Sequence, residues 1–238
     1  MDRSTRAGSP GFPVAHDRYP DRTAAGRVLA EEVRPFVPGG GVVVGIPRGG
    51  AVVAAALAEP LRLPMTLVHV RKIALARSPE LAIGAMDEDG HALVDEALVR
   101  LLHGGQRETA AARERARIEL ERQRRLYAAP PVSVLGRNAT VVLVDDGLAT
   151  GATMRAALHY VRRHGARRVI VAVPCASEDT ARALEHEAER LVCPWIDPGF
   201  GAVGEHYEDF APVSDSEVLT ALARAQQALA NGRQEGRT

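Results

Sequence analysis

The chain has 238 residues, a hydrophobic content of 46% and a formal net charge of +0. This length and composition suit one sizeable α/β domain and exclude a disordered or fibrous chain. The balanced charge predicts no broad nucleic-acid footprint, so any anion site has to be local. The start of the chain has no apolar signal-peptide core, and no later apolar run reaches bilayer length. These features predict a cytoplasmic protein with no membrane partner.

Lysine occurs at a single position, Lys72, whereas every other basic residue among the 30 Lys and Arg is arginine. Lysine presents a compact, flexible ammonium, and arginine presents a planar fork. Lys72 is therefore a candidate for a role that needs a point charge. The alternative interpretation is the chance survival of one surface lysine.

The two ends of the chain differ in character from its middle. Residues 1–20, rich in Gly, Pro, Ser and charge, predict a loose leader. A helix is expected over residues 21–33, where apolar residues recur at helical spacing and Asp21 can serve as the N-cap. We expect a single domain over residues 21–230 and a tail over residues 231–238.

Four short runs of the chain are apolar at consecutive positions instead of alternating. Such runs belong to strands that are buried on both faces, as in a parallel sheet covered by helices. Segments with helical character follow three of the runs. The pattern predicts an α/β fold with an open, mainly parallel sheet and helices on both faces. The expected strands cover residues 42–46, 66–70, 140–144 and 169–173, and the helices cover residues 51–58, 152–164 and 179–190.

A long insert, residues 73–137, interrupts this alternation of strands and helices. Residues 82–94 predict a hairpin whose turn contains Asp87, Glu88, Asp89 and Gly90. Residues 106–127 predict a densely charged helix in which glutamates alternate with arginines, so that the net field largely cancels. This insert is interpreted as a hood or lid over the mouth of the sheet and not as a nucleic-acid-binding arm.

Polar clusters follow three of the predicted strands directly. They are residues 47–50 (Pro-Arg-Gly-Gly), the pair Arg71 and Lys72, and the pair Asp145 and Asp146, which precedes the turn 150–153. The carboxyl ends of parallel strands meet at one edge of a sheet, and ligands of open α/β sheets bind there. All three clusters are therefore expected to face one crevice.

The turn at residues 150–153 (Thr-Gly-Ala-Thr) has the composition of an anion nest at the start of a helix. Its backbone N–H groups, two threonine hydroxyls and the positive helix end can hold a phosphate, and Gly151 lets the backbone approach closely. No Gly-Lys-Ser/Thr follows, so the segment is not a Walker loop.

The stretch Val141 to Met154, with its two acids and its threonine-glycine turn after a buried strand, resembles the phosphoribosyl-pyrophosphate motif of type I phosphoribosyltransferases. Over roughly residues 17 to 220 the chain is similar to the "predicted phosphoribosyltransferase" group, whose acceptor is not settled. The resemblance implies the type I fold, binding of 5-phosphoribosyl-1-pyrophosphate with Mg²⁺, and transfer of ribosyl phosphate to a nitrogenous acceptor with release of pyrophosphate.

The resemblance also implies roles for individual residues. Asp145 and Asp146 would accept hydrogen bonds from the ribose hydroxyls and hold Mg²⁺ mainly through water. Arg48 and Lys72 would neutralise the leaving pyrophosphate, and the peptide between Pro47 and Arg48 is expected to be cis. The remaining substrate contacts would come from Pro47, Gly49, Gly50, Arg71, Ala149, Thr150, Gly151, Ala152, Thr153 and Phe200.

The acceptor side departs from the familiar members of the family. Ala149 stands where hypoxanthine-type enzymes carry an aspartate, and Glu80 is only a weak substitute for the acceptor-side glutamate of adenine-type enzymes. The acceptor and the oligomeric state therefore stay open, and a homo-oligomer is compatible with the sequence. Two alternatives to the transferase remain, a nucleic-acid-binding regulator that senses phosphoribosyl pyrophosphate and a hydrolase of the same compound.

Overall fold

The computed structural model describes residues 18–78, 81–103, 105–132 and 137–235, and the expectations about residues 1–17 and Glu80 lie outside these ranges. Its centre is a five-stranded parallel sheet with the strand order β2-β1-β6-β7-β9. This confirms the predicted fold class. The strands are β1 (Val42–Gly45), β2 (Met65–Leu67), β6 (Thr140–Val144), β7 (Arg168–Ala172) and β9 (Arg190–Val192).

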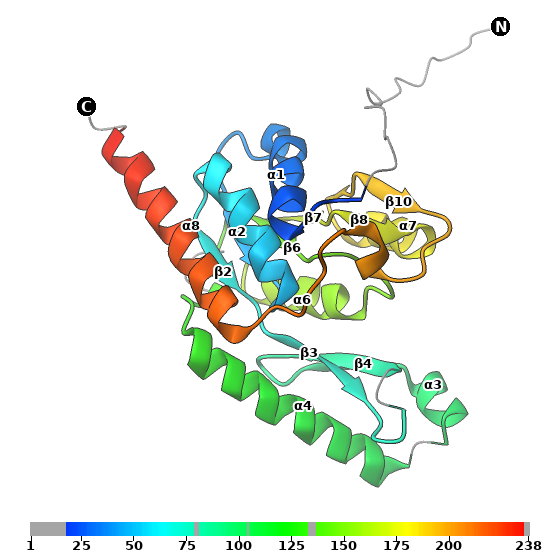
Figure 1. Ribbon diagram of the computed structural model, residues 1–238. Helices are drawn as coiled ribbons and strands as arrows, with labels where there is room; N and C mark the ends of the chain where they lie inside the picture. The colour runs from blue at the N-terminus through cyan, green and yellow to red at the C-terminus, as the bar shows by residue number, and fades with distance from the viewer. Residues whose placement is uncertain (1–17, 79–80, 104, 133–136, 236–238) are drawn as a thin grey trace, which may run out of the picture.

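Helices cover both faces of this sheet (Figure 1). Apolar side chains of α1 (Arg22–Val33), α2 (Gly49–Leu61) and α8 (Asp215–Glu235) join one core with residues such as Val43. Side chains of α6 (Ala152–Arg163) and α7 (Glu178–Glu187) form the other core, with residues such as Leu143. Because both faces are covered, the central strands β1, β6 and β7 are apolar at nearly every position, which is the pattern that the sequence showed.

The first helix, α1, and the last helix, α8, bear on two of the predictions. Asp21 accepts a hydrogen bond from the backbone N–H of Ala24 at 2.7 Å, as predicted for the N-cap of α1. At the other end, α8 continues to Glu235, so residues 231–235 are helical where a tail was expected. Within the described ranges, no helix combines the length and the apolar character that crossing a bilayer requires.

The strand expected over residues 66–70 is corrected by the structure. The sheet strand β2 ends at Leu67, and Val70 already begins a different strand, β3 (Val70–Ala74), in an antiparallel sheet. Val68 and Val70 stay buried through the transition, so the apolar run continues although the chain leaves the sheet. Hydrophobicity alone therefore could not show this break.

The strand β9 was also missed, because the helix expected over residues 179–190 ends at Glu187 in the structure. Only three residues form β9, and only one of them is buried, so they carry no strong strand pattern. Two further short strands, β8 (Cys175–Ser177) and β10 (Trp195–Asp197), pair in parallel beside the main sheet.

The inserted part of the chain, residues 70–127, forms a second layer beside the main sheet and is named the hood here (Figure 1). The antiparallel sheet β3-β4-β5 packs against α4 (Gln106–Tyr127) around apolar residues such as Ile73, Ile83 and Leu120. The expected hairpin is present, and Gly90 in its turn has a φ of +85°. The remaining elements are β4 (Ala82–Asp87), β5 (Ala92–Val94) and α3 (Glu96–Leu101).

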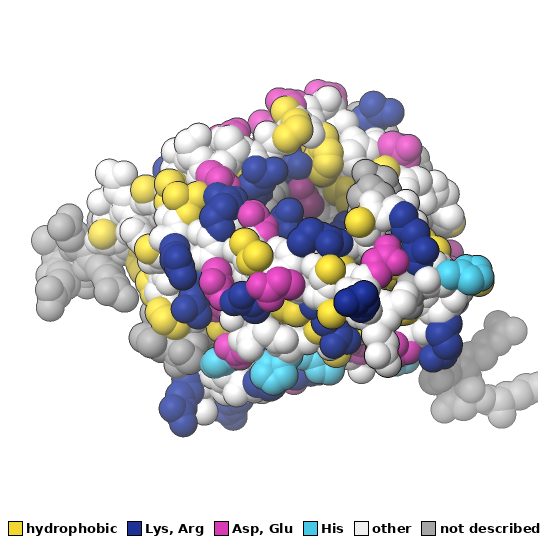
Figure 2. Space-filling model, turned by 90° about the horizontal axis from the view of Figure 1, so that it is seen from below, with side chains coloured by type: hydrophobic (Ala, Val, Ile, Leu, Met, Phe, Trp, Pro, Cys, Tyr) yellow, Lys and Arg dark blue, Asp and Glu magenta, His cyan; other side chains and the backbone are white. Residues whose placement is uncertain are grey.

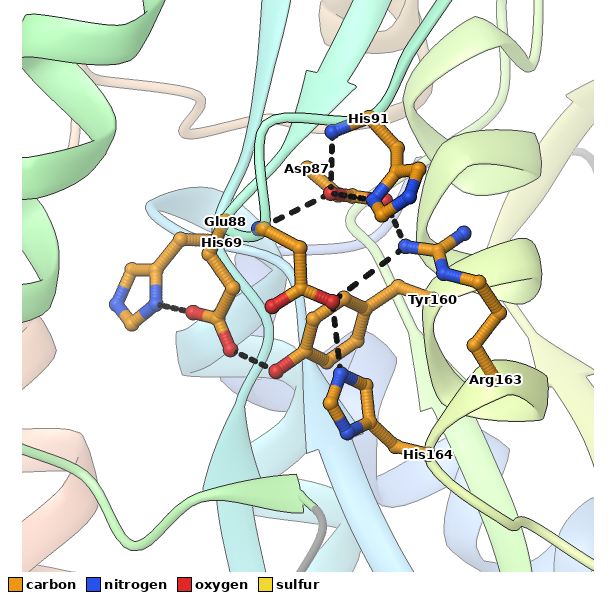
Figure 3. Close-up of polar contacts among 8 residues, drawn as sticks. His69, Asp87, Glu88, His91, Tyr160, Arg163 and His164 are labelled. Atoms are coloured by element: carbon orange, nitrogen blue, oxygen red, sulfur yellow. Dashed lines mark hydrogen bonds and ion pairs between the residues drawn. The ribbon is translucent and has the colours of Figure 1, made fainter.

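The turn of this hairpin fastens the hood to the C-terminal end of α6 through three consecutive acids (Figure 3). Asp87 pairs with Arg163. Glu88 accepts hydrogen bonds from His69 and Tyr160. Asp89 lies 2.9 Å from Nε2 of His164. Asp87 and Glu88 are largely buried, so their charges depend on these partners. This set of contacts is called the hood joint below.

Candidate active site

The polar clusters that were expected to face one crevice do meet in one cavity of about 680 Å³, between the carboxyl ends of the sheet strands and the hood. Eleven of the predicted site residues line it. Arg71 and Lys72 reach the cavity from β3 of the hood, whereas the sequence placed them at the end of a sheet strand. The eleven are Pro47, Arg48, Gly49, Arg71, Lys72, Asp145, Asp146, Ala149, Thr150, Gly151 and Thr153.

The loop after β1 lies directly against the two acids. The Pro47–Arg48 peptide is cis, as predicted, and Arg48 is exposed at the cavity. A Cβ on Gly49 would lie 1.8 Å from Oδ2 of Asp146, and one on Gly50 would lie 2.8 Å from Oδ1 of Asp145. Only glycine fits at these two positions, so the loop and the carboxylates are packed as one unit.

Asp145 and Asp146 follow β6 and place two carboxyl groups side by side. The backbone N–H of Asp146 donates to Oδ1 of Asp145 at 2.9 Å. Burial, and then the neighbouring charge of Asp146, raise the pKa of Asp145 well above its ordinary value. Burial also raises the pKa of Asp146, although Arg22 opposes this shift through a 2.8 Å contact with Oδ2. The pair is therefore poised to gain from an added cation or from hydrogen-bond donors.

The turn after the acids forms the start of α6, with Gly151 as its N-cap at a φ of +70°. Two backbone carbonyl groups at the start of this turn already accept hydrogen bonds from side chains. Ala149 O accepts from Thr180 at 2.6 Å, and Thr150 O accepts from Arg155 at 3.1 Å. The first N–H groups of a helix have no acceptor within the helix. The turn thus presents donors and a positive helix end to an anion.

Four of the described residues that line the cavity are cationic, three of them on the hood. Arg71 and Lys72 are exposed on β3, and Arg115 extends from α4 and donates to Ala74 O at 3.2 Å. The fourth is Arg48 on the core side. The lining acid of the hood, Glu119, is already paired with Arg122 at 2.9 Å. The hood side of the cavity consequently favours anionic groups.

Three predicted site residues are not among those that line the cavity. Gly50 and Ala152 lie in the first turns of α2 and α6, next in sequence to lining residues. Phe200 lies in a separate aromatic cluster, where its ring stacks on His206 with a centroid distance of 4.8 Å. Its neighbours in this cluster are Trp195, Val203 and Phe210, which are near it in the sequence, and Tyr19 from the other end of the described chain. No residue among the described lining residues is aromatic.

Sequence reasoning missed two residues that contact the acids. Arg22 pairs with Asp146 across 124 positions of sequence, and the hydroxyl of Tyr207 donates to the backbone carbonyl of Asp146 at 2.7 Å. The only signal near Arg22 was the helix start at Asp21, which gives no partner. Both contacts come from long-range packing that no local motif encodes.

The described residues offer two places where carboxylates could hold a metal ion. Ligand atoms of Asp87, Asp89 and His91 all lie within 4.8 Å of one another. However, Arg163 already contacts both of these acids, which makes a metal ion a poorer fit. Asp145 and Asp146 line the cavity and retain raised pKa values, so a hard cation suits them better.

Comparison with known proteins identifies the class of this chain. The family model of the phosphoribosyl transferase domain matches residues 27–209, which include β1, the two acids and the start of α6. The chain therefore belongs to the phosphoribosyl transferase family.

Particular relatives agree with this assignment. Two curated proteins of Mycobacterium tuberculosis, from strains CDC 1551 and H37Rv, are each 37% identical over 211 residues, and their names assign them provisionally to the phosphoribosyl transferases. The match covers 88% of this chain and 47% of each relative, so the chain spans about half their length. The crystal structure of TT1426 from Thermus thermophilus is 39% identical, with a TM-score of 0.69, and the match covers 86% of this chain and 97% of that one.

Proposed function

We propose that this chain binds 5-phosphoribosyl-1-pyrophosphate together with Mg²⁺ and transfers its ribosyl phosphate to a nitrogenous acceptor, with release of pyrophosphate. The observation that carries this proposal is the convergence of the loop 47–50, an acid pair, the turn at the start of α6 and Lys72 on one cavity. A substrate with a 5-phosphate, two ribose hydroxyls and a pyrophosphate needs all of these features at once. Membership of the family supports the same reaction class.

The nest and the acids would hold the part of the substrate that does not react. Residues 149–153 would bind the 5-phosphate through backbone N–H groups and the hydroxyls of Thr150 and Thr153. Asp145 and Asp146 would accept hydrogen bonds from the two ribose hydroxyls. Charge-assisted hydrogen bonds of this kind are short and directional, so they would fix the ribose ring and its C1 atom.

The reaction would break the bond between C1 and the pyrophosphate oxygen, which keeps the electron pair, and form a bond from C1 to the acceptor nitrogen, which loses a proton. Arg48 and Lys72 would stabilise the charge that develops on the leaving group. Bound Mg²⁺ would supply further neutralisation of the pyrophosphate, with Asp145 and Asp146 holding it mainly through water. The hood would exclude water from the activated ribose.

The acceptor would enter on the hood side. There Leu75, which follows β3, and Ala112, Arg115 and Ala116 of α4 line the cavity with apolar or cationic side chains, and the acid Glu119 is paired with Arg122. Ala149 provides no acid or base for the acceptor. An acceptor that reacts through its own nitrogen lone pair, without help from a side chain at that position, fits this wall best.

The distribution of charge on the hood supports the transferase over a nucleic-acid-binding regulator. Basic and acidic side chains are interleaved on the face seen from below (Figure 2). Along α4, Arg117 pairs with Glu114 and Glu121, and Arg125 pairs with Glu121. Paired charges of both signs offer no continuous positive surface for a phosphate backbone.

The test is an assay of pyrophosphate release from 5-phosphoribosyl-1-pyrophosphate against a panel of bases and amines, with and without Mg²⁺. The proposal predicts release that requires one acceptor class and stops when the metal is chelated. Release at the same rate without any acceptor would identify a hydrolase. Binding of homopolymer RNA at low salt without pyrophosphate release would identify the regulator.

A further inference from the structure

Arg22, the first residue of α1, is held at the proposed ribose site by three partners from distant parts of the chain. Its Nε atom lies 2.8 Å from Oδ2 of Asp146, and its Nη1 donates to the carbonyl of Ala211 at 2.9 Å. Its guanidinium also lies 3.9 Å from the centre of the Phe210 ring. The side chain is only 11% exposed, so these contacts fix it in one position.

The carboxylate of Asp146 is confined from two sides. Oδ2 receives Arg22 and lies against Gly49, where even a Cβ would come within 1.8 Å. The backbone carbonyl of the same residue accepts a hydrogen bond from Tyr207 at 2.7 Å. Because Arg22 bonds only Oδ2 through a single N–H, Oδ1 of Asp146 keeps its capacity to accept a hydrogen bond.

The charges near Asp146 explain why it needs a cationic partner such as Arg22. Asp145 stands directly before Asp146, and two partly buried carboxylates side by side repel each other. Lys72 also opposes the repulsion, but it is exposed on the hood and faces the cavity. Arg22 contacts Asp146 and is not among the described residues that line the cavity.

We propose that Arg22 is a positioning residue of this site, which holds the carboxylate of Asp146 in the orientation that a ribose hydroxyl requires. The proposal rests on the function proposed above. It also gives the segment from Tyr207 to Ala211 a role, because this segment holds both Arg22 and the backbone of Asp146. α1 and the C-terminal segment are thus part of the substrate site although neither carries the recognised motif.

The role predicts a specific coupling between two substitutions. If Arg22 acts through Asp146, then Arg22→Gln matters only while the carboxylate is present. We expect Arg22→Gln to weaken the binding of Mg²⁺-5-phosphoribosyl-1-pyrophosphate about tenfold, as is common for residues in direct contact. In the Asp146→Asn background the same change should alter binding by less than about twofold. Arg22→Lys, which keeps the charge, should recover part of the loss.

The experiment measures the dissociation constant by calorimetry, and the melting temperature, for the wild type, the three single variants and the double variant. Arg34→Gln is the matched control, because Arg34 follows the same helix and pairs with Glu31 on the surface. We expect wild-type binding in this control. Its melting temperature shows how much a surface arginine of this region contributes to stability.

Two results would overturn the proposal by itself. One is an equal loss from Arg22→Gln with and without the Asp146 carboxylate. The other is a lowered melting temperature with unchanged binding, which would make Arg22 a structural residue only. Failure of the wild type to bind Mg²⁺-5-phosphoribosyl-1-pyrophosphate would instead overturn the proposed function, and this proposal together with it.

Discussion

The two sides of the cavity are built in different ways. On the core side, Asp146, Gly49 and Gly151 are held by close packing and by partners such as Arg22. On the hood side, Arg71 and Lys72 are exposed side chains on a separate sheet. The core side is thus ordered by its own packing, whereas the hood cations are exposed side chains. Preorganised groups on the core side suit the proposed contacts with the ribose and its phosphate, and the cations of the hood suit the charge of the proposed leaving group.

One helix connects the two sides. The N-terminal end of α6 forms the phosphate nest, and its C-terminal end carries Tyr160, Arg163 and His164, which hold the hood joint (Figure 3). The position of the hood over the cavity is therefore set by the same helix whose N-terminal end is proposed to hold the phosphate. The following substitutions separate the contributions of the two sides.

The largest effect is expected on the core side, from Asp145→Asn. The change removes a charged acceptor of a ribose hydroxyl, which should cost about 1.5 to 3 kcal/mol of binding, or roughly 10- to 150-fold in the dissociation constant. Titration of the variant with Mg²⁺-5-phosphoribosyl-1-pyrophosphate measures it. Asp179→Asn, an exposed acid on α7, serves as the control. Equal affinities for Asp145→Asn and the wild type would remove the acid pair from the site.

The hood joint should contribute to stability through Glu88. Its pKa is lowered: burial opposes ionisation, but hydrogen bonds from His69 and Tyr160 favour it more strongly. Glu88→Gln should therefore lower the free energy of unfolding at pH 7 by about 2 kcal/mol, the typical cost of losing such charged hydrogen bonds. Chemical denaturation of both proteins measures the difference.

The pH dependence of this difference has a definite sign. A carboxyl group whose pKa is lowered by folding stabilises the folded protein at pH values above its unfolded pKa, which is ordinarily 4.5 for glutamate. This contribution is lost as the pH falls through the pKa of the folded state. The difference in the free energy of unfolding between wild type and Glu88→Gln should thus be largest near neutral pH and shrink below pH 4.5. Glu121 is an exposed partner of Arg117, so Glu121→Gln should change the free energy of unfolding little at any pH. A gap for Glu88→Gln that grows on acidification would refute the pairing.

A smaller effect is expected from Gly151→Ala in the nest. Gly151 and Gly90 both have a positive φ, so alanine costs about 1 to 2 kcal/mol of stability at either position. Only at Gly151 would the added Cβ also meet Thr180, at 2.8 Å, whereas nothing lies within 4 Å at Gly90. We predict that Gly151→Ala weakens the binding of inorganic phosphate and Gly90→Ala does not. Equal phosphate affinity in the two variants would place the phosphate elsewhere.

The smallest effect should come from the hood cation Lys72. Lys72→Arg keeps the charge but replaces a point ammonium with a planar fork, which should slow pyrophosphate release several-fold, on the order of 1 kcal/mol. Arg77→Lys, on an exposed arginine that pairs with Glu108, controls for exchange of the two residue types on the hood. A wild-type rate of pyrophosphate release in Lys72→Arg would show that the reaction does not need lysine at this position.

The parts of the site that sequence could predict are local in the chain. Asp145, Asp146 and the turn at 150–153 lie within one strand-turn-helix unit, so their relative placement follows from the unit itself. The cis peptide at Pro47–Arg48 was predicted by resemblance and is present. The sheet was predictable because its central strands are apolar at nearly every position.

The parts that could not be predicted depend on distant contacts. Arg22 reaches Asp146 across 124 positions, and Phe200 stacks on His206 in a cluster that Tyr19 joins from the other end of the described chain. The end of β2 was hidden because Val68 and Val70 are buried at the junction with the hood as they would be inside the sheet. In each case tertiary packing, and not local pattern, decides the outcome.

The most direct test of the account is a crystal structure of the protein with Mg²⁺ and 5-phosphoribosyl-1-pyrophosphate. We predict the 5-phosphate at the start of α6 against Thr150 and Thr153, the ribose hydroxyls at Asp145 and Asp146, and the pyrophosphate between the loop 47–50 and Lys72. A complex whose phosphate groups lie away from the start of α6, or whose ribose does not contact the two acids, would contradict the proposed function.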